Sequence, residues 1–155
     1  MAGNLVERGP FLLHFANSQK LTALLSRSFA DGRAPLTIDE FAVYSLLRLA
    51  GPTTPTRLAH DLGMPASTMT HYLRRMDAAG HLSRRPNPED RRSSLIELTT
   101  AGSDATVACF PAFGTAIAAF RRHLMVPEKE LLTAMSAMND ALHAAHEDLT
   151  VDERT

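Results

Sequence analysis

Nine prolines divide the 155-residue chain into segments, and their spacing constrains the fold more than any other sequence feature. Proline is tolerated at a helix start but breaks a helix interior, because it lacks the backbone N–H and clashes with the preceding turn. The segments between the prolines carry apolar residues at helical spacing. A mostly helical fold is therefore expected.

Four helices are predicted in the first half of the chain. Their expected ranges are 10–30, 38–50, 55–62 and 65–79. Asp31-Gly32 should end the first, Thr37 and Glu40 match a capping box for the second, and Gly63 should turn the chain after the third. The fourth helix has one buried stripe, consisting of Met69, Tyr72, Leu73 and Met76.

A β-hairpin is predicted next. Residues 82–85 are short and extended, the loop 86–90 is rich in turn residues, and 94–98 has β-branched, alternating character. A fifth helix should run from Thr99 or Thr100 to about His123 with a kink at Pro111, and Pro127 should start a sixth. The apolar stripe of the sixth helix is Leu131, Met135, Met138, Leu142, Ala145 and Leu149.

This order of elements predicts a fold that is mostly α with a small β-hairpin wing, a winged helix-turn-helix. Residues 36–99 would form the winged lobe, and residues 10–31 and 100–149 the flanking dimerisation helices, within a single domain.

Composition fits one globular domain, with 45% hydrophobic and 21% charged residues. The single cysteine, Cys109, cannot form an intrachain disulfide. Residues 1–10 do not resemble a secretory signal, and we expect no apolar stretch of the roughly 20 residues that span a membrane. The expected location is cytoplasmic.

Charge is unevenly distributed along the chain, although the formal net charge is only −1. Residues 57–92 hold seven arginines and four acidic residues, a balance of +3. From His123 onward there are seven acidic residues, one lysine and one arginine, a balance of −5. A basic region of this kind is typical of nucleic-acid binding, and a solvated charged face is the alternative.

An α-helix fits the major groove of DNA, where short polar and cationic side chains reach base edges or phosphates. The candidate DNA-binding residues of the fourth helix are Ser67, Thr68, Thr70, His71, Arg74 and Arg75. At the hairpin tip, Arg91 and Arg92 could enter the narrow minor groove, and Asp90 could fix an arginine rotamer.

The segment Pro86 to Gly102 resembles the wing signature of the MarR family of bacterial transcription regulators, with Asp90-x-Arg92 followed by Leu98-Thr99-x-x-Gly102. The resemblance extends in looser form over nearly the whole chain. It implies a homodimer that reads a pseudo-palindrome in double-stranded DNA and is often released by a small ligand or an oxidant.

By the same resemblance, the base-contacting residues would be Ser67, Thr70, His71 and Arg75. Arg92 would be the wing residue, with Asp90 as its ion-pair support. His71 departs from the family pattern, in which a basic or amide side chain is commoner, so the base preference stays open.

Two-fold pairing would place two recognition helices about 34 to 36 Å apart, one turn of B-DNA. The apolar first and sixth helices are expected to supply the contact between subunits. The sixth-helix stripe could also pack on the fifth helix of its own subunit, and the two arrangements are compatible.

A ligand cavity is predicted at the junction of the first, second and fifth helices. Its candidate lining residues are Phe11, His14, Phe15, Phe41, Tyr44, Phe110 and Phe113. The alternative for the phenylalanines is that they simply fill the core.

Neither a redox switch nor a metal site is favoured by the sequence. Cys109 has no nearby cation to lower its pKa, and His143 with His146 reads as a solvated pair, so no cofactor is expected. We find no catalytic motif and predict a non-enzyme. A winged helix used for protein docking is the alternative to DNA binding, and the cationic surface favours DNA.

Overall fold

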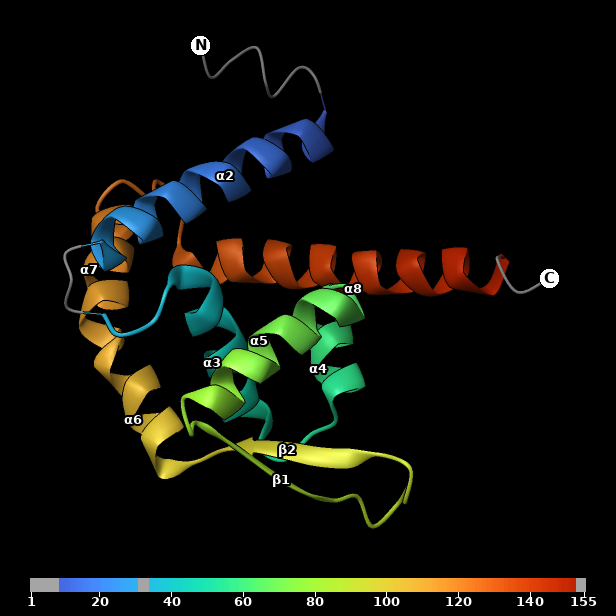
Figure 1. The fold of residues 1–155 in the computed structure, drawn as a ribbon. Helices are drawn as coiled ribbons and strands as arrows, with labels where there is room; N and C mark the ends of the chain where they lie inside the picture. The colour runs from blue at the N-terminus through green and yellow to red at the C-terminus, as the bar shows by residue number, and fades with distance from the viewer. Residues whose placement is uncertain (1–8, 31–33, 153–155) are drawn as a thin grey trace. The chain divides into compact units, whose positions relative to one another are not determined.

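The computed structural model describes residues 9–30 and 34–152, without the side chains of 10, 147 and 149–152. These residues fall into two compact units, one ending at Ala116 and the other beginning at Ile117. The prediction of a mostly helical fold with one hairpin is confirmed (Figure 1).

The first two helices are α2 (Pro10–Phe29) and α3 (Ile38–Ala50). The predicted capping box at the start of α3 is present, because Thr37 N donates to Glu40 Oε2 at 2.9 Å and Glu40 N donates to Thr37 Oγ1 at 3.3 Å. The predicted stop of the first helix at Asp31-Gly32 lies outside the described residues.

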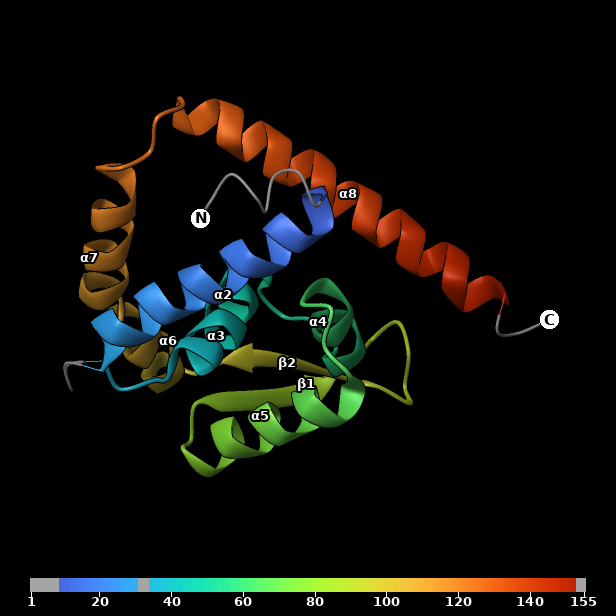
Figure 2. The same cartoon turned by 90° about the horizontal axis from the view of Figure 1, so that it is seen from above.

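Helix α3 lies at the centre of the first unit, with α2 on one side and the hairpin on the other (Figures 1 and 2). Its buried face supplies Phe41, Val43, Tyr44 and Leu47 to the core. The other large core side chains with almost no exposed surface are Leu58, Met69, Met76 and Ile96.

The helix-turn-helix consists of α4 (Pro55–Asp61) and α5 (Ala66–Ala78). Thr54 caps α4 by accepting a hydrogen bond from Arg57 N at 3.2 Å. Between the helices, Gly63 has a φ of 60°, which a residue with a Cβ rarely adopts. This turn sets the direction in which α5 leaves α4.

The wing is the antiparallel pair β1 (Leu82–Pro86) and β2 (Ser94–Leu98), in the predicted positions. A third segment joins it, because Ile96 N donates to Thr53 O at 2.7 Å and Thr53 N donates to Ile96 O at 3.1 Å. Strand β2 is therefore hydrogen-bonded along both edges, to β1 and to Thr53.

The chain after the wing was predicted to be one kinked helix, and this prediction is wrong in detail. The structure has two helices, α6 (Thr100–Ala108) and α7 (Phe110–Arg121), that meet at Cys109. Pro111 lacks the N–H that would continue the helical hydrogen bonds, so the helix ends and restarts. The sixth predicted helix is present as α8 (Glu128–Asp152).

Helix α6 begins directly against the turn between α5 and the wing. Thr99 Oγ1 donates to Gly80 O at 2.8 Å, and Thr99 N donates to His81 O at 3.0 Å. A Cβ on Gly102 would overlap the His81 carbonyl oxygen, so only glycine fits there without a shift. The end of the α5 turn and the start of α6 are thus in backbone contact.

The expectation that no stretch is long and apolar enough to span a membrane is also wrong. Residues Thr100–Arg121 pass that test by length and composition, with a mean hydropathy of 1.3. Core helices of soluble proteins pass it too, and this stretch supplies Thr106, Cys109 and Ala116 to the buried set.

Candidate nucleic-acid interface

Helix α5 is amphipathic. Met69 and Met76 are each 1% exposed and Leu73 is 4% exposed, so one face of the helix is locked into the core. The opposite face carries all six predicted DNA-binding residues, which are exposed: Ser67, Thr68, Thr70, His71, Arg74 and Arg75. The short polar groups lie in the first half of the helix and the cations in the second half.

The polar groups of α5 retain hydrogen-bonding capacity for a partner. Thr70 Oγ1 donates to Ala66 O at 2.8 Å, which leaves the hydroxyl oxygen free to accept. The His71 ring lies edge-on to the Tyr72 ring, with centroids 6.1 Å apart. This contact limits the orientation of the His71 ring.

The two arginines of α5 differ in their contacts. Arg75 Nη2 lies 2.6 Å from Glu40 Oε1 on α3, so its guanidinium has a partner within the subunit. Arg74 has no ion pair with any residue in the described ranges and stays available to an anion.

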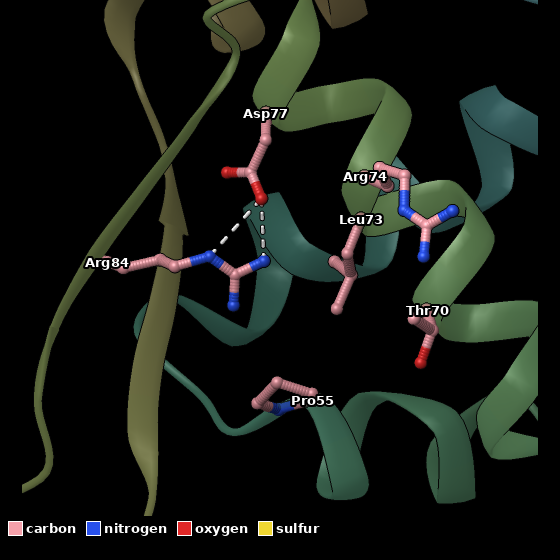
Figure 3. A pocket seen from close by; sticks show the side chains of 6 residues that line it. All are labelled: Pro55, Thr70, Leu73, Arg74, Asp77 and Arg84. Atoms are coloured by element: carbon pink, nitrogen blue, oxygen red, sulfur yellow. Dashed lines mark hydrogen bonds and ion pairs between the residues drawn. The ribbon is translucent and has the colours of Figure 1, made fainter.

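A surface hollow of about 270 Å³ lies between α4, α5 and β1 (Figure 3). Its lining residues are Pro55, Thr70, Leu73, Arg74, Asp77 and Arg84. On one wall, Arg84 Nη2 lies 2.7 Å from Asp77 Oδ2 and Nε lies 3.3 Å from the same oxygen. This ion pair links α5 to β1, the first strand of the wing.

The wing tip is held by a set of short hydrogen bonds. Asn87 Nδ2 donates to Ser93 Oγ at 2.8 Å, and Ser93 N donates to Asp90 O at 3.0 Å. Asp90 Oδ1 accepts from the backbone N–H of Arg92 at 2.9 Å. Asp90 therefore supports the loop backbone, whereas the resemblance implied an ion pair with the Arg92 guanidinium.

Both tip arginines, Arg91 and Arg92, are exposed and form no ion pair with the described part of the chain. With Arg74 on α5, they place unpaired cations on two separate elements of the winged lobe. Such an arrangement suits a polyanion that contacts a helix and a hairpin together.

The predicted aromatic ligand site is only partly assembled. The rings of Phe110 and Phe113 pack on Phe41, with centroid distances of 6.1 and 5.3 Å; Phe41 belongs to the core, whereas Phe110 is 42% exposed. Phe11 and Phe15, by contrast, are 79% and 62% exposed, and His14 is exposed as well.

The remaining member of that predicted site, Tyr44, is 4% exposed and makes a 3.0 Å hydrogen bond to His81 Nδ1. Burial raises its pKa above the usual value, and the nearby Glu40 carboxylate raises it further. Its hydroxyl is therefore engaged at the turn that leads from α5 to β1.

Cys109 is fully buried, and burial raises the pKa of its thiol. A raised pKa is the opposite of what a reactive thiolate needs. Among the residues that the structure describes, no group of three or more histidine, cysteine or acidic side chains could hold a metal ion.

Two acidic residues of this surface were missed by sequence analysis. Glu40 was identified only as a capping residue, and Asp77 only as one of the local acids, yet each binds an arginine of the winged lobe. Glu40 and Arg75 are 35 positions apart, so no local pattern joins them. The turn residue Asn87 carried a local signal, the Asn-Pro dipeptide.

Comparison with known sequences gives one family. The MarR family model matches residues 36–94, which hold α3, the helix-turn-helix and most of the wing. The multiple antibiotic resistance protein MarR of Escherichia coli is 32% identical over 66% of this chain and 69% of its own length. The transcriptional repressor YetL of Bacillus subtilis is 32% identical over 81% of this chain and 75% of its own length.

Comparison with solved structures agrees. A cysteine-to-serine mutant of E. coli MarR, solved in complex with operator DNA, superposes with a TM-score of 0.68 at 28% identity. The similarity covers 84% of this chain and 91% of that one. The shared fold therefore extends beyond the winged lobe.

Proposed function

Because the chain belongs to the MarR family of winged-helix regulators, we propose that it binds double-stranded operator DNA as a homodimer and represses transcription. The observation that supports this most directly is the exposed polar face of α5 beside the unpaired wing arginines Arg91 and Arg92. In this proposal α5 lies in the major groove and the wing tip reaches the minor groove.

Roles follow from the contacts within the subunit. Ser67, Thr70 and His71 would meet base edges, since they lie in the first half of α5. Arg74 would meet a phosphate or a guanine edge. Arg92 would enter the minor groove, on a loop whose backbone Asp90 fixes.

The homodimer proposal rests on apolar surface that the single chain leaves exposed. Phe11 and Phe15 on α2, and Met135 and Leu142 on α8, are all at least 49% exposed. Burying such side chains contributes about 1.5 to 3 kcal/mol each. We infer that α2 and α8 meet their counterparts in a second copy, which gives each dimer two reading helices.

The second part of the proposal is that a small aromatic ligand releases the protein from its operator DNA. The hollow of Figure 3 offers an anionic group the guanidinium of Arg74, which has no ion pair among the described residues, whereas Arg84 is paired with Asp77. A ligand there would compete for the same face as DNA, so titrating benzoate into the protein–DNA complex at constant ionic strength should lower the bound fraction. Unchanged binding at saturating benzoate would contradict this part alone.

The main proposal is tested with a duplex selected by the purified protein from random DNA, and with a shuffled duplex. Arg92→Ala should weaken binding and relax the preference for a narrow A·T-rich flank. His71→Ala should change the preference at one base step by about 1 to 3 kcal/mol. Arg122→Ala is the matched control, because it removes an exposed arginine just beyond α7.

Gel-shift titrations at two salt concentrations separate these effects, since phosphate contacts depend on salt. Equal affinities for wild type, Arg92→Ala and His71→Ala would overturn DNA recognition and favour the protein-docking alternative. Two relatives, YetL of Bacillus subtilis and NicR of Pseudomonas putida, are named as transcriptional repressors, which supports a role without catalysis and a location beside cytoplasmic DNA.

A further inference from the structure

The carboxylate of Glu40 has two different partners, one on each oxygen. Oε2 accepts from Thr37 N at 2.9 Å and from Thr37 Oγ1 at 3.0 Å, which caps α3. Oε1 lies 2.6 Å from Arg75 Nη2 on α5. The side chain of Glu40 is only 12% exposed, so the first turn of α3 holds this carboxylate in one place.

The partner of Glu40 Oε1 in this ion pair is Arg75. Its side chain is 55% exposed, and His71 and Arg74 are exposed on the same helix. Glu40 and Arg75 both influence the pKa values of Tyr44 and Tyr72, and Asp39 also raises the pKa of Tyr72, which is consistent with a compact charged cluster between α3 and α5. The guanidinium of Arg75 thus lies against a carboxylate that the first turn of α3 holds in place.

We propose that Glu40 is a positioning residue that determines DNA specificity by holding the Arg75 guanidinium in one orientation and neutralising its charge. This inference rests on the proposed function, because it concerns how the reading helix discriminates between DNA sequences. It adds a residue outside α5 and the wing to the recognition apparatus.

The physical reason is the difference between a fixed and a mobile cation. An unpaired arginine is attracted to any phosphate, and each such contact adds affinity for all sequences alike. An arginine held by a carboxylate loses less rotamer entropy on binding and presents its remaining N–H groups in a defined direction. The pair therefore reduces non-specific attraction and favours one base or phosphate geometry.

Glu40→Gln separates this role from helix capping. Glutamine also serves in a capping box, so its oxygen can replace Oε2 at Thr37. Its NH₂ group then faces Arg75 and cannot accept a hydrogen bond from it. Asp104→Asn is the matched control, since Asp104 is an exposed acid on α6 with no ion pair among the described residues and the change in charge is the same.

The measured quantity is the ratio of affinities for the selected duplex and the shuffled duplex. We expect Glu40→Gln to lower this ratio about tenfold, equivalent to the loss of one oriented contact. Binding of shuffled DNA should become tighter, and its logarithmic salt dependence steeper by about 0.9, as for one additional phosphate contact. Asp104→Asn should leave the ratio unchanged.

A double-mutant cycle identifies the route of the effect. In an Arg75→Ala background, Glu40→Gln should no longer change the ratio, because the group that it positions is gone. NMR of the Arg75 Nε–H gives a second measurement without DNA, in which rotation of the guanidinium should be slow in wild type and fast in Glu40→Gln. Urea unfolding of each variant checks that the fold is kept.

A ratio in Glu40→Gln equal to that of Asp104→Asn would overturn the inference, as would an equal loss in the Arg75→Ala background. Those outcomes leave the proposed function intact, since wild type would still prefer its selected duplex. If wild type shows no preference between the two duplexes, the proposed function fails and this inference fails with it.

Discussion

At the scale of single residues, burial shifts three titratable groups in the same direction. The pKa values of Tyr44, Tyr72 and Cys109 are all raised, with burial as the main cause in each case. Each group is uncharged in its protonated form, so the folded protein holds these protons more tightly than the unfolded chain does.

The consequence is a loss of stability in alkali. The contribution of each group is fully present below its ordinary pKa, which is 9.0 for Cys109 and 10.0 for the tyrosines, and is lost as the pH rises beyond that value. Urea unfolding at intervals between about pH 8 and pH 11 should therefore give a falling free energy of unfolding. Tyr44→Phe should show a shallower fall, and a flat or rising profile in wild type would contradict this assignment.

Much of the candidate site could be predicted from local signals in the sequence. Polar residues on the outward face of α5 were predicted from helical periodicity, and all six are exposed. The partners of Arg75 and Arg84 could not be predicted, because Glu40–Arg75 and Asp77–Arg84 depend on how α3, α5 and β1 pack. Periodicity reports which face of a helix is polar, and it does not report which side chain on another element meets that face.

At the scale of elements, the turn after α5 packs so closely against the start of α6 that no side chain fits between them at Gly102. Gly102 lies against the His81 carbonyl, and Thr99 bonds both Gly80 and His81. No comparable constraint surrounds Gly114 in α7, where a Cβ would meet nothing within 4 Å.

Gly102→Ala should therefore destabilise the protein by about 1 to 3 kcal/mol, as overpacking does elsewhere. Gly114→Ala is the matched control and should stabilise by about 0.4 to 1 kcal/mol, since alanine restricts the unfolded chain and suits a helix. Chemical denaturation of the two variants measures both effects. Equal stabilities would show that α6 can move away from His81 without cost.

The boundaries of most elements were predictable because prolines, glycines and caps mark them locally. Pro55, Gly63 and the Thr37–Glu40 box each lie where the sequence placed a helix end. The effect of Pro111 was underestimated, since a proline that removes one hydrogen bond can either bend a helix or end it. Which of the two happens depends on packing around Cys109, where the chain is fully buried.

At the scale of the whole molecule, the proposed dimer depends on apolar side chains that a single chain leaves in water. On α8, Met135 is 51% exposed and Leu142 is 49% exposed. Both belong to the stripe predicted from the sequence. The side chain of Leu149, the last member of that stripe, lies outside the described residues.

The double variant Met135→Glu/Leu142→Glu should dissociate the dimer and abolish binding to the selected duplex. The helical content should stay unchanged, because glutamate is a good helix former. The control is Asn139→Glu, which adds a charge at an exposed polar position of the same helix. Sedimentation equilibrium measures the assembly state, and a monomeric wild type or a dimeric double variant would contradict the proposed arrangement.

The β-bridge between Thr53 and Ile96 has a consequence for how the wing meets DNA of varying shape. Since β2 is hydrogen-bonded along both edges, to β1 and to Thr53, we expect bending of the wing to be concentrated in the seven residues from Asn87 to Ser93 that close its far end. These residues would therefore be the ones that change conformation when the groove is wider or narrower than the preferred one. The free-energy cost of binding a duplex with an unfavourable groove width then falls mainly on the wing tip, while the rest of the subunit keeps its geometry.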